Sequence, residues 1–424
     1  MIVAHRGPWA RIRSRGALGF ALLALMLSLF IVVPAPTRLL LPLGVGAPEL
    51  SGVLTLHAIL AMLAAMPDVR SSRMSRWALG VGAIALCLAI SPLVRFPPVA
   101  RAADATLQAT LGPAYASDFA PPQRSTSGSA PVVTALARTA PLVIADLFRP
   151  FAADSARITR DIVFARPSGE ALTMDVYRPM IGAAGGAKLP VLVQIYGGAW
   201  QRGEPSDFAE FARYFAARGY VVFAIDYRHA PQYRYPAQLE DVRAALAHIA
   251  SHAEEFNADT SRMVLLGRSA GAHLAMLAAY SPGAPPVRGV ISYYGPVDLT
   301  EGYRHPPSPD PLRVRDVDAA FLGGSPAQQP NEYREASPIT YATRRQPPTL
   351  LLYGGRDHIV EARFGRMLRD ALRDSGNTVV HVEIPWAEHA FDAVPNGPSG
   401  QLARYVTERF LAWAVSPGNQ SRMK

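Results

Sequence analysis

Residues 262–280 read RMVLLGRSAGAHLAMLAAY, and this stretch decides the fold. A short apolar run (263–266) leads into Gly267-Arg268-Ser269-Ala270-Gly271, and a second run of small and apolar residues follows. The pattern predicts a buried strand, a tight turn and a helix, because small residues on both sides of Ser269 permit a strained turn that exposes the serine hydroxyl. The start of the predicted helix favours negative charge that develops beside it.

The same alternation of strand and helix continues on both sides of this stretch. Short, continuous apolar or β-branched runs are typical of strands that are covered on both faces. The predicted strands are 161–166, 171–177, 190–196, 220–225, 262–266, 288–294, 349–353 and 379–384, and the predicted helices are 206–218, 238–255, 270–280, 359–375 and 400–414. This order predicts an α/β fold, a mostly parallel sheet of about eight strands with helices on both faces.

A glycine-rich turn, Tyr196-Gly197-Gly198-Ala199-Trp200, ends the predicted strand 190–196. At this place in a parallel sheet, such a turn lets backbone N–H groups point at an acyl oxygen. A tight turn that needs glycine for a positive φ explains the same residues, so this motif decides nothing by itself.

Two later motifs supply the partners that a serine nucleophile needs. Asp357 follows strand 349–353 in Gly354-Gly355-Arg356-Asp357, and His389 follows strand 379–384 in Glu388-His389-Ala390-Phe391. The chain order serine, acid, histidine is the one this architecture uses, so we expect Ser269, Asp357 and His389 to form a catalytic triad. Glu361 is the alternative acid, whereas His273 and His358 are expected to pack or point elsewhere.

These motifs together resemble the hormone-sensitive-lipase-like and carboxylesterase branch of the α/β-hydrolases over about residues 160–415. The shared features are the oxyanion turn (YGGAW), the segment from Asp226 to Ala237, the serine turn, the G-x-x-D segment and the H-A-F segment. The resemblance implies that backbone N–H groups of Gly198, Ala199 and Ala270 form an oxyanion hole, with Gly197 shaping the turn. Three residues depart from the usual pattern: Tyr196 replaces a histidine, Ala199 replaces a glycine and Arg268 precedes the serine.

The expected function is hydrolysis of carboxylic esters, a class of small molecules, through an acyl-enzyme on Ser269. A serine peptidase or an acyltransferase would use the same triad, and a non-catalytic binding domain is the alternative of another class. No cofactor and no metal are expected. Cys87 is the only cysteine, which excludes an intramolecular disulfide and a cysteine-rich zinc site.

Three uncharged apolar stretches, 16–33, 50–66 and 77–94, precede the α/β region. A helix of this length nearly spans the hydrocarbon core of a bilayer, so we expect three transmembrane helices and a lipid bilayer as partner. His57 and Gly52 weaken the second stretch, and a cleaved signal peptide is the alternative for residues 1–35.

The distribution of arginine predicts the orientation. Residues 1–101 hold ten arginines and two acidic residues, so most of the net charge of +9 lies there and only +1 falls on residues 102–424. The arginines cluster before the first stretch and between the second and third, which places the N-terminus in the cytoplasm and the α/β region on the extracytoplasmic side. The excess positive charge thus lies beside the expected transmembrane helices, and nucleic acid is not an expected partner.

The chain divides accordingly into a membrane region (1–100), a linker with a possible interfacial helix at 132–150 (101–155), an α/β-hydrolase domain (156–416) and a tail (417–424). Between strands 288–294 and 349–353 lie about fifty residues rich in proline and arginine, which we expect to be poor in helix and to cover the active site. A polar cover provides little apolar wall for a long acyl chain, which favours short-chain esters.

Overall fold

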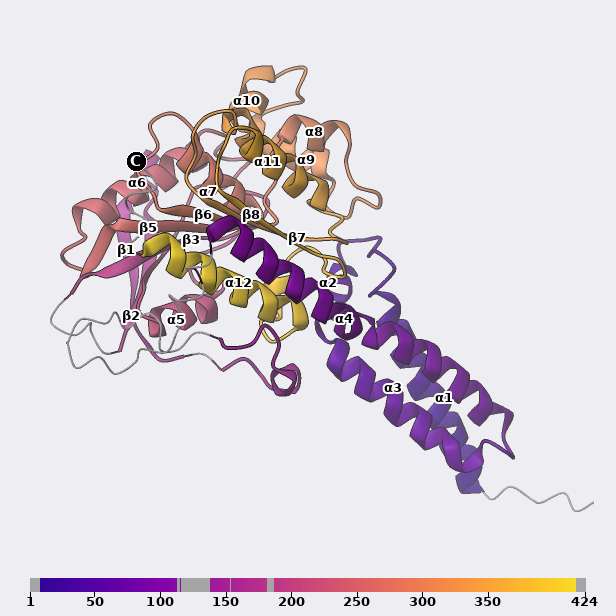
Figure 1. Cartoon of the computed structure of the whole chain (residues 1–424). Coiled ribbons are helices and arrows are strands. Elements are labelled where there is room, and N and C mark those ends of the chain that lie inside the picture. Colours follow the sequence, from indigo (N-terminus) through magenta and orange to yellow (C-terminus); the bar gives the residue numbers. More distant parts are fainter. Residues whose placement is uncertain (1–7, 113–114, 116–137, 153, 181–186, 417–424) are drawn as a thin grey trace, which may run out of the picture.

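The structure is a computed structural model that describes residues 8–112, 115, 138–152, 154–180 and 187–416. It consists of a three-layer α/β domain and a bundle of long helices that projects from one side of it (Figure 1). The strands and helices of the α/β domain run from Ala156 to Val415. The expected tail, residues 417–424, and part of the expected linker, residues 113–114 and 116–137, lie outside the described residues.

One eight-stranded sheet forms the centre of the α/β domain, in the order β1-β2-β4-β3-β5-β6-β7-β8. The strands are β1 (Ala156–Ala165), β2 (Leu172–Pro179), β3 (Leu189–Ile195), β4 (Val221–Ile225), β5 (Ala258–Arg268), β6 (Gly289–Tyr293), β7 (Thr349–Gly354) and β8 (Val379–Ile384). β2 pairs antiparallel with β1 and β4, and all other neighbours are parallel. The predicted fold class is confirmed, and every predicted strand is present.

Helices cover both faces of the sheet, with α6, α7 and α11 on one face and α5 and α12 on the other (Figure 1). Their bounds are α5 (Ala209–Ala217), α6 (Ala237–Ser251), α7 (Ala270–Tyr280), α11 (Ala362–Asp374) and α12 (Pro398–Val415). Every residue of α7 is buried, because this helix packs against β5 and β6 and also contacts the neighbouring helix α6. The described residues also contain short 3-10 helices, which are η1 (Met66–Asp68), η5 (Ile144–Phe148), η6 (Pro167–Gly169), η8 (Pro338–Tyr341) and η9 (Phe391–Ala393).

The bundle consists of α1 (Pro8–Leu29), α3 (Ser51–Ala65) and α4 (Arg73–Leu111). Alanines such as Ala21, Ala58 and Ala85 are fully buried between these helices and allow their backbones to approach closely. Large apolar side chains on the outer surface are exposed instead, including Leu22 and Ile84, and the three helices are long and apolar enough to cross a membrane. They are therefore candidate membrane spans.

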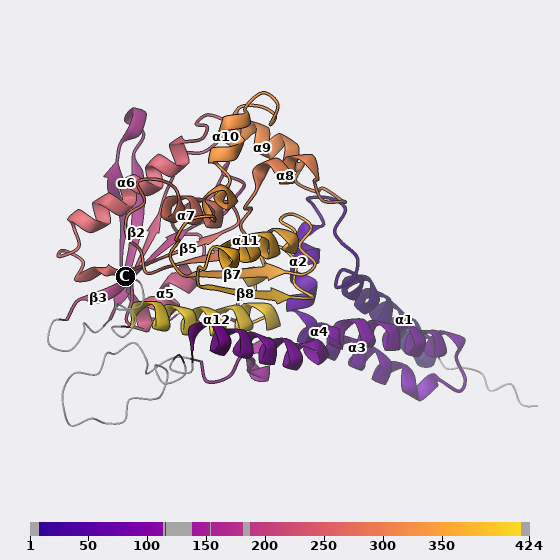
Figure 2. The ribbon, with the colours of Figure 1, turned by 45° about the horizontal axis from the view of Figure 1, so that its top comes forward.

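Helix α4 is longer than expected. The apolar stretch 77–94 ends inside it, and the helix continues through Pro97 and Pro98 to Leu111, so the first part of the expected linker is helical. Phe96, Ala103 and Leu107 are buried there, and this half of α4 lies beside α12 (Figure 2). Alanine-rich sequence occurs in both linkers and helices, so composition does not distinguish them. Here the apolar side chains on one face of α4 pack against the α/β domain, which stabilises the helix.

The N-terminal region also contacts the α/β domain through the connector (residues 30–40) and α2 (Leu41–Glu49). The imidazole of His358 donates a hydrogen bond from Nε2 to the carbonyl of Ala35 (3.1 Å). Glu49 is buried, and its Oε2 accepts a hydrogen bond from the N–H of Ser399 (2.9 Å) at the start of α12. The N-terminal region and the α/β domain therefore share a buried interface.

The cover segment (residues 295–348) contains three short helices, so the expectation that it is poor in helix was wrong. These are α8 (Leu299–Arg304), α9 (Val314–Leu322) and α10 (Pro330–Glu335). Their lengths give too few turns for a clear periodic pattern in the sequence. In the segment 132–150, the described residues from 138 onward hold only the five-residue turn η5, rather than the possible interfacial helix.

Candidate active site

The serine lies at the sharp turn between β5 and α7. Ser269 has φ 52° and ψ −121°, a strained conformation, and its N–H donates to the carbonyl of Tyr293 (2.9 Å). Gly271 lies so close to β3 that a Cβ there would be 2.2 Å from the carbonyl oxygen of Tyr196. Glycine at this position therefore lets α7 pack against the sheet, while the turn exposes the serine side chain.

The structure brings Ser269, His389 and Asp357 together in one hydrogen-bonded chain. His389 Nε2 is 3.0 Å from Ser269 Oγ, and His389 Nδ1 is 2.7 Å from Asp357 Oδ2. The other carboxylate oxygen of Asp357 accepts the N–H groups of Ile359 and Val360, each at 2.8 Å. These two hydrogen bonds fix the carboxylate, which in turn fixes the plane of the imidazole.

The rival residues lie elsewhere. Glu361 pairs with Arg363 (2.8 Å) at the start of α11 rather than with His389. His273 is fully buried, with Nε2 hydrogen-bonded to the carbonyl of Ala336 (2.6 Å) and Nδ1 accepting from Trp200 Nε1 (3.2 Å). Burial lowers the pKa of His273 to about 4, so it packs as a neutral ring.

The glycine-rich turn after β3 passes directly against the serine. A Cβ on Gly197 would lie 2.7 Å from the carbonyl oxygen of Arg268 and 3.0 Å from Ser269 Cβ. Gly198 has φ 136° and Ala199 has φ 58°, conformations that turn the backbone sharply at this point. Ala270, the fourth residue of the expected oxyanion hole, begins α7.

Tyr196, at the position where the family usually has histidine, holds the start of this turn in place through its side-chain contacts. Its hydroxyl hydrogen-bonds Asp226 and lies 2.9 Å from His229 Nε2, and its ring stacks on Tyr227 with centroids 4.4 Å apart. Burial, followed by the charge of Asp226 and its neighbour, raises the pKa of Tyr196, so the phenol stays protonated. The substitution therefore keeps a buried hydrogen-bonding side chain at this position.

Arg268, the other unusual residue, forms a buried ion pair that the sequence did not reveal. Its Nε lies 2.5 Å from Asp392 Oδ2, and the guanidinium faces the rings of Phe208 (4.1 Å) and Phe211 (4.3 Å). Asp392 also accepts a hydrogen bond from the hydroxyl of Tyr294, whose ring is 4.5 Å from that of His389. The pair therefore supports the loop that carries the histidine. Asp392 follows His389 by three residues, but nothing in its spacing points to Arg268.

A second pair links the two loops that hold the acid and the histidine. His358 Nδ1 hydrogen-bonds the carboxylate of Glu388, and Glu388 Oε1 also accepts the backbone N–H groups of His358 (3.1 Å) and His389 (2.8 Å). Burial opposes protonation of His358, but the hydrogen bond and charge of Glu388 outweigh it and raise the pKa. Since His358 also contacts Ala35, the connector is joined to both loops.

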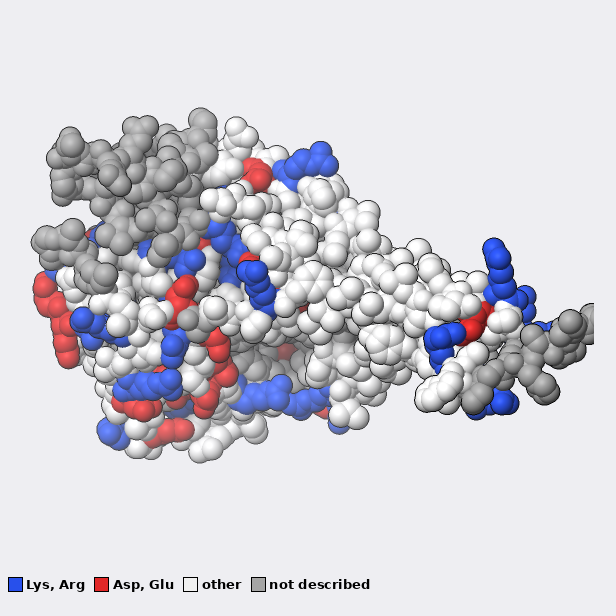
Figure 3. Space-filling view, turned by 90° about the horizontal axis from the view of Figure 1, so that it is seen from below, with Lys and Arg blue, Asp and Glu red and all other residues white. Residues whose placement is uncertain are grey.

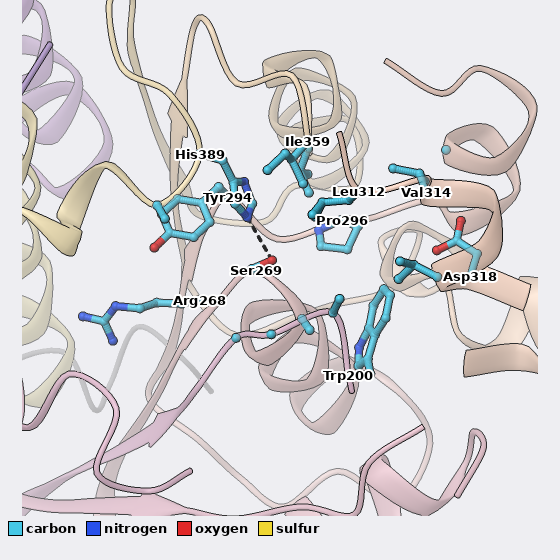
Figure 4. A pocket seen from close by; sticks show the side chains of 18 of the residues that line it. Trp200, Arg268, Ser269, Tyr294, Pro296, Leu312, Val314, Asp318, Ile359 and His389 are labelled. Carbon is cyan, nitrogen blue, oxygen red and sulfur yellow. Dashed lines mark hydrogen bonds between the residues drawn. The ribbon is translucent and has the colours of Figure 1, made fainter. Parts of the chain in front are cut away.

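A cavity of about 340 Å³ opens beside Ser269 and His389 (Figure 4). Its walls come from the glycine-rich turn, from the cover segment and from the start of α11, and the N-terminal region contributes Arg38 and Leu41. Most of the lining is apolar, including Leu312, Val314 and Ile359, although the cover segment is rich in polar residues. Among the described residues, no cluster of histidine, cysteine and acidic side chains could hold a metal ion.

Eight strands in this order, with a serine at the strand-to-helix turn and an acid and a histidine after the last two strands, define an α/β-hydrolase. The BD-FAE family model matches residues 174–372. The chain is 31% identical over 338 residues to the probable carboxylic ester hydrolase LipM of Mycobacterium tuberculosis, covering 76% of this chain and 75% of LipM. It is 31% identical over 272 residues to the esterase LipQ of the same organism, covering 61% of each.

The fold agrees with these relatives. The structure superposes on a hyperthermophilic esterase from the archaeon Pyrobaculum calidifontis with a TM-score of 0.53 and 24% identity, covering 60% of this chain and 85% of that one. The chain belongs to the carboxylic ester hydrolase family of α/β-hydrolases that includes LipM. The resemblance found in the sequence motifs is confirmed.

Proposed function

We propose that this protein is a membrane-anchored serine hydrolase that cleaves carboxylic esters through an acyl-enzyme intermediate. The single observation that carries the proposal is the chain of hydrogen bonds from Ser269 Oγ through His389 to Asp357. Its position at the carboxyl ends of the strands, beside a cavity and a glycine-rich turn, is where an α/β-hydrolase performs its chemistry. The named activities of LipM and LipQ support the same class of substrate.

In the proposed mechanism, His389 Nε2 takes the proton of Ser269 as Oγ attacks the ester carbonyl. Asp357 holds the Nδ1–H tautomer and stabilises the imidazolium. The negative charge on the carbonyl oxygen is stabilised by the N–H groups of Gly198, Ala199 and Ala270. His389 then gives its proton to the departing alcohol, and water, activated by the same histidine, releases the acid.

The experiment that tests this proposal compares Ser269 with a serine on the strand that precedes it. In detergent-solubilised full-length protein, Ser269→Ala should abolish labelling by a fluorophosphonate probe and lower turnover of p-nitrophenyl butyrate by about a thousandfold or more. Ser261→Ala, at the amino end of β5 and exposed, should leave both unchanged. Near-normal turnover in Ser269→Ala would refute the assignment.

The membrane anchor is proposed to be α1, α3 and α4, with the N-terminus in the cytoplasm and the α/β domain outside it. The charged side chains of the bundle gather at the end remote from the α/β domain (Figure 3). Arg11, Arg15, Arg73 and Arg76 surround one depression there, whereas the loop between α1 and α3 holds a single arginine, Arg38. The positive-inside rule supports this orientation.

The proposed substrates are esters of short acyl chains. The cavity of about 340 Å³ is at the small end of the range for ligand pockets. Trp200, which stacks on Phe321 with centroids 4.2 Å apart, closes one of its sides with rigid rings. The wall is more apolar than the sequence indicated, so the limit on chain length comes from volume rather than from polarity.

A further inference from the structure

One face of α9 forms part of the wall of the active-site cavity. Val314, Val317 and Asp318 all line it, at the spacing of residues on a single helix face. Two of these residues are apolar, as a cavity wall requires, and the third carries a carboxyl group. Figure 4 shows Asp318 and Val314 on α9, with Ser269 and His389 across the same cavity.

Asp318 is a buried acidic residue. Only 3% of the residue is exposed, and its Oδ2 has no hydrogen-bond partner among the residues that the structure describes. Burial, together with the nearby charge of Asp310, raises the pKa of Asp318 well above its ordinary value, which favours the protonated form of the carboxyl group. A buried polar group that forms no hydrogen bond destabilises a protein, and in an active-site cavity the missing partner can belong to the substrate.

We propose that Asp318 is a specificity-determining residue that hydrogen-bonds a hydroxyl group on the substrate, remote from the scissile ester bond. This inference rests on the proposed function. It deepens that function by assigning the substrate to the hydroxylated esters, with apolar atoms against Val314 and Val317 and one hydroxyl at Asp318.

The chemistry of the cavity favours a hydroxyl over a cationic amine. A protonated carboxyl group both donates and accepts, which matches a hydroxyl group in both roles. Three arginines, Arg38, Arg202 and Arg268, also line the cavity, and they disfavour a positively charged ligand. A purely apolar ester would leave the carboxyl group buried and unpaired, so the site discriminates against it.

The test uses pairs of esters that differ by one hydroxyl: butyl acetate with 4-hydroxybutyl acetate, and ethyl butyrate with ethyl 3-hydroxybutyrate. The first pair places the hydroxyl on the alcohol part and the second on the acyl part. For the full-length enzyme in detergent, kcat/KM should favour the hydroxylated ester of at least one pair by about ten- to a hundredfold. Asp318→Leu should remove that preference, because a leucine side chain cannot hydrogen-bond the hydroxyl group, and Asp318→Asn should retain part of it.

Asp316→Leu is the matched control, because Asp316 lies on the same helix but is largely exposed and pairs with Arg313. Its preference should equal that of the wild-type enzyme. The inference is overturned if the wild-type enzyme shows no preference in either pair, or if Asp318→Leu slows the two esters of a pair equally. Full ester turnover by Ser269→Ala would instead refute the proposed function, so the two failures are distinguishable.

Discussion

Removing the carboxylate of Asp392 should destabilise the protein strongly, because it would leave the Arg268 guanidinium buried with no counter-charge. Arg268 is 1% exposed, its Nε–H donates to Asp392, and neither Nη1 nor Nη2 has a hydrogen-bond partner among the described residues. Breaking a buried pair from one side costs about 3–5 kcal/mol. The rings of Phe208 and Phe211 attract the cation, but a cation–π contact is worth about 0.5–2 kcal/mol and is already present in the wild type.

The assay is thermal unfolding of Asp392→Ala in detergent, with ester turnover measured in parallel. For a domain of this size the expected cost lowers Tm by roughly 6–20 °C. The double variant Arg268→Met with Asp392→Leu should recover most of the loss, since replacing both partners by apolar side chains is often neutral. A fall in Tm of less than about 2 °C, or a double variant no more stable than Asp392→Ala, would refute the reasoning that the buried charge is the cause.

The other predictions concern the acid, the pH dependence, the topology and the acyl chain. Asp357→Asn should lower kcat by about ten-thousandfold and Glu361→Gln only slightly, because only Asp357 contacts His389; the reverse order in stopped-flow or steady-state turnover would move the acid to Glu361. Burial raises the pKa of Glu49 from 4.5 to about 8, so the folded protein keeps a proton that the unfolded chain releases, and stability falls as pH rises through that window by at most about 1.4 kcal/mol per pH unit. Glu49→Gln should flatten the plot of Tm against pH between pH 5 and 8 and raise Tm at pH 8, and an unchanged slope would speak against a protonated Glu49. A C-terminal alkaline-phosphatase fusion should be active and a green-fluorescent fusion exported by the general pathway dark; the opposite pattern would mean that one apolar stretch, with 50–66 the first to examine, does not cross. On p-nitrophenyl esters, kcat/KM should peak between acetate and hexanoate and fall by dodecanoate, and a full-length enzyme that prefers palmitate to butyrate would contradict the limit set by the cavity.

The order of strands and helices could be predicted from the sequence because buried parallel strands are continuous apolar runs, and the chain repeats them between amphipathic helices. The same reading located Ser269, Asp357 and His389, since each follows a predicted strand and parallel strands bring those positions to one edge. The structure places Ser269 and Asp357 each within hydrogen-bond distance of His389.

What the sequence did not reveal depends on contacts between distant residues. Arg268 and Asp392 are separated by 124 positions, and neither residue's neighbours indicate that the two meet. Likewise, the second half of α4 has the composition of a linker, and only its packing against the α/β domain distinguishes it. The apolar inner face of the cover segment could not be predicted either. Its helix α9 is short and is surrounded by prolines, arginines and acidic residues, so its apolar residues form no clear periodic pattern in the sequence.

The connector has a practical consequence for anyone who wishes to study the enzyme in water. A shortened chain that starts at residue 102 would retain Ser269, Asp357 and His389 but would lose Ala35, the hydrogen-bond acceptor of His358. It would also lose Leu41 from the cavity wall and Glu49 from the start of α12. Kinetic constants measured on such a fragment would describe a reshaped pocket, so substrate profiling belongs on the whole chain in a lipid or detergent environment.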